Sequence, residues 1–250
     1  MKRTIGIMGF GRFGQFMAAH LSPRFDVIAG SRSDHAAEAE ALGVEWAPLQ
    51  TAAEQDCVIV SVSISTLHDV LRSFAPSFSR GALVCDVSSV KVYPCSLLDA
   101  YVPEGCHCLG THPLFGPDTA RAGLAGHTIA LCPLRGYDPG PIASTLTDMG
   151  LEVIQTTPDE HDRNMARSLA LIHFMGSALS GLGIGDVTLA TATHRRLCEL
   201  VSITHNDSPQ LLLDMHRYNP YAAGVRRELI DRLVRLDGEL SSLEAEGMEH

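Results

Sequence analysis

Residues 4–21 have the sequence TIGIMGFGRFGQFMAAHL and decide the fold, because an apolar strand-like run passes through three glycines into an amphipathic helix-like run. The spacing Gly9-x-Gly11-x-x-Gly14 at such a junction is typical of a Rossmann-type dinucleotide-binding unit. Gly9 permits the tight turn, Gly11 lets the backbone approach a pyrophosphate, and Gly14 lets the helix pack on the strand. N–H groups at the helix N-terminus would face the phosphates. The alternative is a glycine-rich turn that binds nothing.

The alternation of strand-like and helix-like segments continues over the first 155 residues. It predicts an α/β fold with a doubly wound, parallel sheet covered by helices on both faces. Beyond this region the pattern is helical throughout, so we expect a Rossmann-type domain at 1–156 and an all-helical C-terminal domain at 157–250. Predicted strands cover 4–10, 25–30, 57–62, 82–87, 106–110, 127–132 and 151–156. Predicted helices cover 12–21, 34–42, 66–73, 91–100, 139–149, 158–183, 190–205, 208–217 and 220–245.

The composition limits the classes of partner. The formal net charge is −10 over 250 residues, without a long basic run, so we expect neither nucleic acid nor an anionic membrane surface as a partner. No apolar run reaches the roughly 18 residues of a membrane span, and no signal-peptide cleavage pattern is found, so we expect a cytoplasmic protein. Seven cysteines scattered through apolar segments favour buried, reduced thiols. Strand alternation would direct His107 away from Cys106 and Cys108, and we predict no metal site.

The end of the second predicted strand indicates which nucleotide binds. An NAD-binding chain places an acidic residue about 20 residues after the glycines, where it accepts hydrogen bonds from the ribose hydroxyls. Here that position holds Gly30, followed by Ser31, Arg32 and Ser33. A guanidinium and two hydroxyls can bind the 2′-phosphate that a carboxylate would repel, so we predict NADP as the cofactor. The alternative is that Arg32 is a solvated loop residue.

A second informative segment is GTHPLFGPDTA, residues 110–120. His112 stands between Thr111 and Pro113, and a Gly-Pro pair follows shortly after. We expect this segment to form a loop after a strand, on the side of the sheet where ligands bind in open α/β folds. An imidazole, with an ordinary pKa of about 6.5, can accept a proton near neutral pH. A rigidly held histidine at this place therefore indicates acid–base chemistry.

Several segments together resemble the prephenate/arogenate dehydrogenase family of tyrosine biosynthesis, and within it the plant-like arogenate dehydrogenase branch. The matching segments, in the family's order, are IGIMGFGRFGQF, SRSD, DVSSVK, GTHPLFGP, EHD at 160–162 and RYNPYA at 217–222. The resemblance implies an NADP-dependent oxidoreductase that takes a hydride from a cyclohexadienol ring. Its partner would be a small-molecule substrate, and its assembly a homodimer formed through the helical domain.

The resemblance also implies roles for single residues. His112 becomes the catalytic base, and Ser89 of the DVSSVK motif hydrogen-bonds the substrate hydroxyl and helps to orient the histidine; only the motif register favours Ser89 over Ser88. The expected cofactor-binding residues are Gly9, Gly11, Arg12, Phe13, Gly14, Ser31, Arg32, Ser33 and Ser63. The expected substrate-binding residues are Ser89, His112, Asp118, Thr119, His173 and Asp207.

Some of these residues have a structural alternative. Asp118 and Thr119 could form an ordinary surface turn, and His173 could be a hydrogen-bonded core histidine. His161 is interpreted as part of a helix start that follows Pro158. Small residues at 176–185, GSALSGLGIG, predict closely packed helices, either within the chain or across a dimer interface.

The substrate prediction depends on one acidic residue. Arogenate carries an ammonium group where prephenate carries a keto group, so a well-placed carboxylate favours arogenate. The segment THNDS resembles a TxxDS motif of arogenate-preferring members, which places Asp207 in that role. Alternatively, Asp207 or Ser208 is the N-cap of the next helix, with Pro209 at its first position. We predict oxidative decarboxylation of arogenate to tyrosine.

One departure from the family and three other functions stay open. Bacterial members carry an arginine for the ring carboxylate where this chain has Ser202, Ile203 and Thr204. Arg163, Arg217 and the arginines of a partner subunit are unranked candidates for that role. The first other function is a prephenate dehydrogenase that yields 4-hydroxyphenylpyruvate. The others are a different NADP-dependent reductase, such as a pyrroline-carboxylate reductase, and a non-catalytic NADPH sensor. Neither of these two explains THPLFGP together with DVSSVK.

Overall fold

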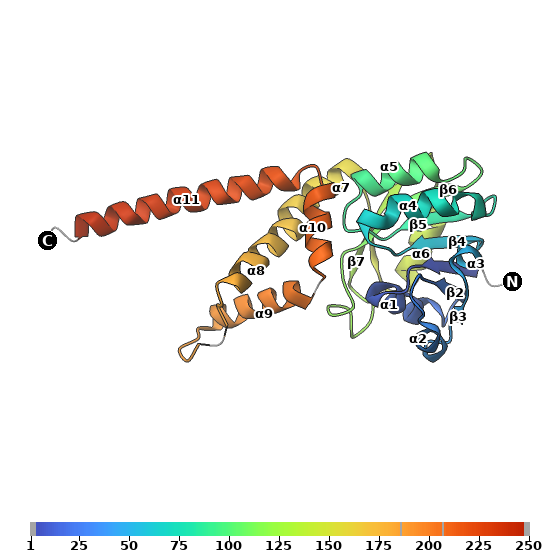
Figure 1. Ribbon diagram of the computed structural model, residues 1–250, viewed down its shortest axis with the longest axis horizontal. Coiled ribbons are helices and arrows are strands. Elements are labelled where there is room, and N and C mark those ends of the chain that lie inside the picture. The colour runs from blue at the N-terminus through green and yellow to red at the C-terminus, as the bar shows by residue number, and fades with distance from the viewer. Residues whose placement is uncertain (1–3, 186, 207, 248–250) are drawn as a thin grey trace. The chain divides into compact units, whose positions relative to one another are not determined.

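The computed structural model describes residues 4–185, 187–206 and 208–247. The chain divides into two compact units, Met1–Asp162 and Arg163–His250. The first unit contains the whole sheet, and the described part of the second contains helices alone. This arrangement confirms the predicted fold class, a Rossmann-type α/β sheet followed by a helical region (Figure 1).

The sheet of the first unit has eight strands in the order β3-β2-β1-β4-β5-β6-β7-β8. The order reverses direction between β1 and β4, and at such a switch point open α/β sheets bind ligands beyond the carboxyl ends of the strands. The strands are β1 (Thr4–Met8), β2 (Asp26–Gly30), β3 (Glu45–Trp46), β4 (Cys57–Val60), β5 (Leu83–Asp86), β6 (His107–Pro113), β7 (Thr128–Pro133) and β8 (Glu152–Gln155).

The expectation of a wholly parallel sheet is wrong at one place. Strands β6 and β7 pair antiparallel, whereas the other neighbouring pairs are parallel. A parallel connection needs a crossover, usually a helix, but the segment 114–127 between these strands contains none. The sequence also did not predict β3 and the short helix α3 (Leu49–Ala53), because two strand residues and five helical residues give too little periodicity.

Helices cover both faces of the sheet, as Figure 1 shows. Side chains of α3, α4 and α5 pack with Met8, Val58 and Val84 on one face. Side chains of α1 and α2 pack with Ile7 and Ile59 on the other face. On that face, side chains of α6 pack with apolar side chains of β5 to β8. The remaining helices of this unit are α1 (Arg12–Leu21), α2 (Ala36–Ala41), α4 (Ile64–Phe74), η1 (Ala75–Ser77), α5 (Val92–Tyr101) and α6 (Gly140–Asp148).

The helical region begins with one long segment that changes its hydrogen-bonding pattern. The predicted helix 158–183 is observed as α7 (Pro158–Met165), a π-helical turn η2 (Ala166–Ala170) and α8 (Leu171–Gly181). A Cβ atom at Gly176 would overlap the side chain of Thr204, so small residues do bring α8 and α9 close together within the chain. The last helices are α9 (Ala192–Asn206), α10 (Pro209–Tyr218) and α11 (Ala222–Gly247). No helix in the described part of the chain is long and apolar enough to cross a membrane.

Candidate active site

The glycine turn between β1 and α1 has the geometry that the motif predicts. Gly9 has a φ of +104°, which only glycine adopts readily, and its N–H donates to the carbonyl of Gly30 over 2.8 Å. A side chain at Gly14 would overlap the carbonyl of Gly9, so the helix approaches the turn closely. A Cβ at Gly11 would meet no atom within 4 Å. The backbone at Gly11 is therefore open to a ligand, which fits a dinucleotide.

The residues expected to select the nucleotide lie beside this turn. Strands β1 and β2 end in register, with Met8 opposite Gly30, so the 31–33 segment follows at the same edge of the sheet. Arg32 and Ser33 are exposed, and Ser31 is half-buried. The same edge contains Ser63, the N-cap of α4, whose hydroxyl lies 2.9 Å from that of Thr66. Each of these side chains is accessible to a bound molecule.

Two residues given separate roles by the sequence contact each other. Arg12, expected to bind the cofactor, donates to Asp118, expected to line the substrate pocket, over 2.8 Å. Asp118 also accepts from Arg121 over 3.0 Å, and these two guanidinium groups lower the pKa of its carboxyl. The hydroxyl of Thr119 accepts from the N–H of Gly116 over 2.9 Å, which closes the turn. The turn alternative thus describes Thr119 well, while Asp118 connects the 114–127 segment to α1.

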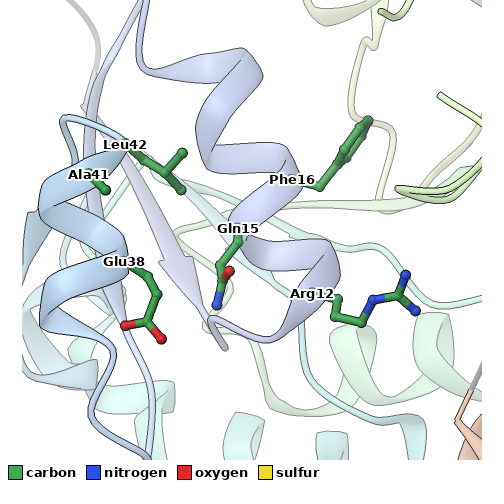
Figure 2. A pocket seen from close by; sticks show the side chains of 6 residues that line it. All are labelled: Arg12, Gln15, Phe16, Glu38, Ala41 and Leu42. Atoms are coloured by element: carbon green, nitrogen blue, oxygen red, sulfur yellow. The ribbon is translucent and has the colours of Figure 1, made fainter. Parts of the chain in front are cut away.

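Arg12 also borders a surface hollow between α1 and α2, which Figure 2 shows. Gln15 borders it from α1 and Glu38 from α2. Its full lining is Arg12, Gln15, Phe16, Glu38, Ala41 and Leu42. Arg12 is the only lining residue that the sequence assigns to a site, and Ser89 and His112 are not part of it. Phe13, one residue further along α1, is half-buried and has its ring 5.9 Å from that of Phe16.

His112 lies on a strand, so the prediction that it stands in a loop is wrong. Strand β6 continues to Pro113 because β7 pairs with it there, His112 opposite Ala130. The other neighbour, β5, ends at Asp86, opposite Gly110. His112 therefore extends beyond the carboxyl end of β5 but is still held by a sheet partner. Only 6% of it is exposed.

A buried ion pair joins the ends of β5 and β6. Lys91 is fully buried, and its Nζ lies 2.5 Å from Oδ2 of Asp86 and 2.6 Å from the carbonyl of Thr111. Thr111 in turn donates its hydroxyl to the carbonyl of Asp86 over 2.5 Å. Removing either member of such a pair leaves an uncompensated buried charge, so both members are needed for stability. The result is a fixed position for the residue that follows Thr111, which is His112.

His112 also contacts a residue that the sequence interpretation treated as a helix start. Nδ1 of His112 lies 2.8 Å from Nε2 of His161, and Nδ1 of His161 lies 2.8 Å from Oδ1 of Asp162. All three side chains are buried. His161 does lie in α7, but its imidazole is part of this buried cluster. The EHD motif was visible in the sequence, but a pairing over 49 residues has no local signal.

The environment of His112 disfavours its protonated form. Burial, the neighbouring His161 and the charge of Lys91 hold the pKa of His112 well below its ordinary value of 6.5. The imidazole is therefore neutral at pH 7 and can accept a proton. No hydrogen bond is made by its Nε2 within the described part of the chain.

The adjacent serines Ser88 and Ser89 differ in their partners. Both are buried, at 8% exposure each. The N–H of Ser88 donates to Oδ2 of Asp86 over 2.9 Å. The hydroxyl of Ser89 is buried and has no hydrogen-bond partner among the described residues. A buried hydroxyl without a partner costs about 1–3 kcal/mol, which a ligand hydroxyl could recover.

Of the two substrate residues predicted in the helical unit, the structure describes His173 but not Asp207. His173 lies buried in α8, and Asp207 lies outside the described residues. The hydroxyl of Ser208 accepts from the N–H of Leu211 over 3.2 Å, and Pro209 occupies the first helical position, so Ser208 is the N-cap of α10. The two candidate arginines are exposed and stack on tyrosines, Arg163 on Tyr221 at 4.4 Å and Arg217 on Tyr218 at 5.4 Å.

No group of three or more possible metal ligands occurs in the residues that the structure describes. The first unit contains an open glycine turn at the switch point of a Rossmann-type sheet and a neutral, buried histidine that extends beyond the carboxyl end of β5. These features define a nucleotide-binding dehydrogenase fold with a candidate acid–base residue.

Comparison with known proteins agrees with this class. A family model described as "Prephenate dehydrogenase, nucleotide-binding domain" matches residues 22–150, and one described as "TYRAAT1-like, C-terminal domain" matches residues 178–250. Arogenate dehydrogenase 2, chloroplastic, of Arabidopsis thaliana is 30% identical over 97% of this chain and 69% of its own length. The chain therefore belongs to the prephenate/arogenate dehydrogenase family, a family of oxidoreductases, as the sequence motifs predicted.

Solved structures show the same fold. The crystal structure of Synechocystis arogenate dehydrogenase superposes with a TM-score of 0.69 at 23% identity, covering 95% of this chain and 93% of that one. Prephenate dehydrogenase from A. aeolicus, in complex with hydroxyphenyl propionate and NAD⁺, superposes with a TM-score of 0.75 at 19% identity, covering 98% and 93%.

Proposed function

We propose that this protein oxidises and decarboxylates arogenate to tyrosine, with His112 as the base that accepts the proton of the ring hydroxyl. The observation that carries the proposal is the neutral, buried imidazole of His112 held at the carboxyl end of the sheet that also carries the glycine turn. NADP, when bound, supplies the acceptor for the hydride. The name of the Arabidopsis relative, an arogenate dehydrogenase, supports the choice of substrate class.

The residues of the chain perform the remaining parts of the reaction. Ser89 donates or accepts a hydrogen bond at the ring hydroxyl with its otherwise unpartnered Oγ. His112 takes the hydroxyl proton, which makes the attached carbon a better hydride donor. Loss of the ring carboxylate as CO₂ then gives the aromatic ring, and the phenol oxygen recovers a proton. Lys91 and Asp86 keep the two strand ends in register throughout.

The choice of NADP is also a proposal. Gly9, Gly11 and Gly14 have a geometry into which a dinucleotide pyrophosphate fits. Gly30 supplies no carboxylate at the end of β2, and the exposed Arg32 supplies a positive charge two residues further along the chain. A charge-assisted hydrogen bond from Arg32 to a 2′-phosphate contributes about 1.5–3 kcal/mol. We therefore expect NADP to bind more tightly than NAD.

The preference for arogenate is assigned to Asp207, whose carboxylate would pair with the substrate ammonium. Because Ser208 supplies the helix cap of α10, the capping role does not account for an acid at the preceding position. A steady-state assay at 340 nm with arogenate or prephenate and NADP⁺ or NAD⁺ tests the proposal. We expect the highest kcat/KM with arogenate and NADP⁺. Absence of turnover with both substrates would contradict the proposed activity.

We further propose a homodimer formed through the helical unit. Helix α11 exposes a series of large apolar side chains, which a partner surface would cover. They are Ile230, Leu233, Val234, Leu236, Leu240 and Leu243. A molar mass near twice 26.9 kDa in light scattering is the expected result. We also propose a cytoplasmic location for this chain, in contrast to the Arabidopsis relative, whose name places it in the chloroplast.

A further inference from the structure

We infer that His161 and Asp162 are positioning residues that hold His112 in one tautomer, with the proton on Nδ1 and the lone pair on Nε2. The inference rests on the proposed function for the role of His112 as a base. Its physical basis is a continuous line of hydrogen bonds from a carboxylate through one imidazole to another. The three side chains come from β6 and from the first turns of α7, both within the first compact unit.

The line begins at a carboxylate that accepts hydrogen bonds from two backbone N–H groups. Oδ1 of Asp162 accepts from the N–H of Lys91 over 2.6 Å, and Oδ2 accepts from the N–H of Val92 over 2.9 Å. These are the first N–H groups of α5, where the helix dipole is positive. A backbone N–H can only donate, so both carboxylate oxygens of Asp162 act as acceptors.

The positions of the protons follow from this acceptor. Because Oδ1 of Asp162 only accepts, Nδ1 of His161, 2.8 Å away, must carry a proton and donate it. In the tautomer that we infer, Nε2 of His161 carries the lone pair that accepts from Nδ1 of His112 over 2.8 Å. His112 is in this way left with its lone pair on Nε2. That nitrogen makes no hydrogen bond in the described part of the chain and is the atom that meets the substrate.

The arrangement has a second consequence during the reaction. When the O–H bond of the substrate breaks and an N–H bond forms at Nε2, His112 becomes positively charged. Its Nδ1–H then donates more strongly to His161, and the carboxylate of Asp162 lies one imidazole further along the same line. A negative charge so placed stabilises the imidazolium only after proton transfer, which is the property that raises kcat.

A purely structural role for the same residues is the competing explanation. Asp162 connects α7 to the N-terminus of α5. If this connection were its only role, replacing Asp162 would change the stability of the protein and leave the tautomer of His112 unchanged. The two explanations differ in a spectroscopic property that needs no turnover. The ¹⁵N chemical shifts of a histidine ring distinguish a protonated from an unprotonated nitrogen, and therefore report the tautomer directly.

The first experiment uses the full chain, labelled with ¹⁵N-histidine and assigned by comparison with His112→Asn. At pH 7.5 we expect Nδ1 of His112 to be protonated and Nε2 to be unprotonated. A proton on Nε2 would overturn the inference even if the enzyme is active. If the expected tautomer is found but neither arogenate nor prephenate turns over, the proposed function fails and the positioning inference stands.

The second experiment compares Asp162→Asn with Asp159→Asn, an exposed acid of the same helix turn. Asparagine has a single acceptor oxygen, so it can accept from only one of the N–H groups of Lys91 and Val92. Its NH2 group at the Oδ1 position can donate to His161, so the enforced tautomer is lost. We expect Asp162→Asn to populate the Nε2–H form of His112 and to lower kcat by about 10²–10⁴-fold with little change in KM. Asp159→Asn should change neither. An unchanged tautomer and kcat in Asp162→Asn would overturn the inference.

His161 gives a graded version of the same test. In His161→Leu the acceptor for Nδ1 of His112 is removed, whereas in His161→Gln an amide oxygen can still accept that bond. We expect the leucine variant to lose more kcat than the glutamine variant, at equal NADP affinity. Equal losses of kcat in the two variants, with an unchanged His112 tautomer, would contradict the positioning role of His161 and support a purely structural one.

Discussion

The candidate catalytic residues of the first unit and the candidate carboxylate-binding arginines of the second are held in different ways. In the first unit the residues nearest the proposed chemistry are buried and fixed by several bonds each: Lys91 joins two strand ends, and Asp162 accepts from two backbone N–H groups. In the second unit, Arg163 and Arg217 are exposed and stack on tyrosines, and α11 exposes a row of apolar side chains. The comparison teaches that the proposed reaction uses buried residues held by the sheet, while the proposed substrate choice and assembly use exposed residues of the helices.

The sharpest test of this difference is to remove the base from the rigid unit. His112→Asn keeps a polar side chain of similar size but cannot accept the proton. We expect kcat to fall by about 10²–10⁴-fold, which is the usual contribution of a general base. NADP affinity, measured by fluorescence titration, should change less than about twofold. A variant that keeps wild-type turnover would remove the catalytic role of His112.

A smaller loss is expected from the serine at the end of β5. Ser89→Ala removes the buried hydroxyl that has no partner in the described chain, so no internal hydrogen bond is lost. We expect kcat/KM to fall by about 10–100-fold, the value of one hydrogen bond to the substrate, while the melting temperature stays within about 2 °C. Ser88→Ala is the matched control, since only the backbone of Ser88 bonds to Asp86. A larger loss in Ser88→Ala than in Ser89→Ala would reverse the assignment.

The cofactor edge of the same unit gives a test of similar size. Arg32→Ala should weaken NADP binding by about 10–100-fold, because one charge-assisted bond is lost. NAD binding should be nearly unchanged, since NAD lacks the 2′-phosphate. Dissociation constants for both nucleotides check this prediction. Equal weakening of both would mean that Arg32 contacts a part of the cofactor that the two nucleotides share.

In the helical unit we expect a change of preference rather than a loss of chemistry. Asp207→Asn removes the charge that would pair with the ammonium of arogenate. The ratio of kcat/KM for arogenate to that for prephenate should fall by about 10-fold, with kcat for prephenate rising. The control is Glu199→Gln, which removes an exposed acid from α9 of the same unit and should leave the ratio unchanged. No change in the ratio would end the proposed role of Asp207.

The smallest effect concerns pH. Burial, His161 and Lys91 lower the pKa of His112, so the base stays neutral until the pH falls well below 6.5. In the profile of kcat/KM, the loss of activity attributable to this group should therefore occur on the acid side of pH 6.5. His161→Gln removes one of the groups that lower the pKa of His112, so its acid limb should move upward. An acid limb above pH 7 in the wild type would contradict the assigned environment.

The sequence predicted the fold and the cofactor turn well because both follow local rules. The spacing of Gly9, Gly11 and Gly14 determines a strand–turn–helix unit without reference to the rest of the chain. The pairing of His112 with His161 was not predictable, because it depends on how α7 packs against β6 and α5. The placement of His112 on a strand was missed for a related reason. Strand β7 pairs antiparallel with β6 after a connection without a helix, and sequence periodicity does not reveal which strands pair.

The central claim is that Nε2 of His112 takes the hydroxyl proton at the place where the hydride leaves. A crystal structure of the protein with NADP⁺ and a non-reactive ring alcohol tests it most directly. We expect Nε2 to lie about 2.6–3.2 Å from the hydroxyl oxygen, with the carbon bearing that hydroxyl facing the nicotinamide ring. A structure in which His112 points into packed protein, away from both ligands, would contradict the account.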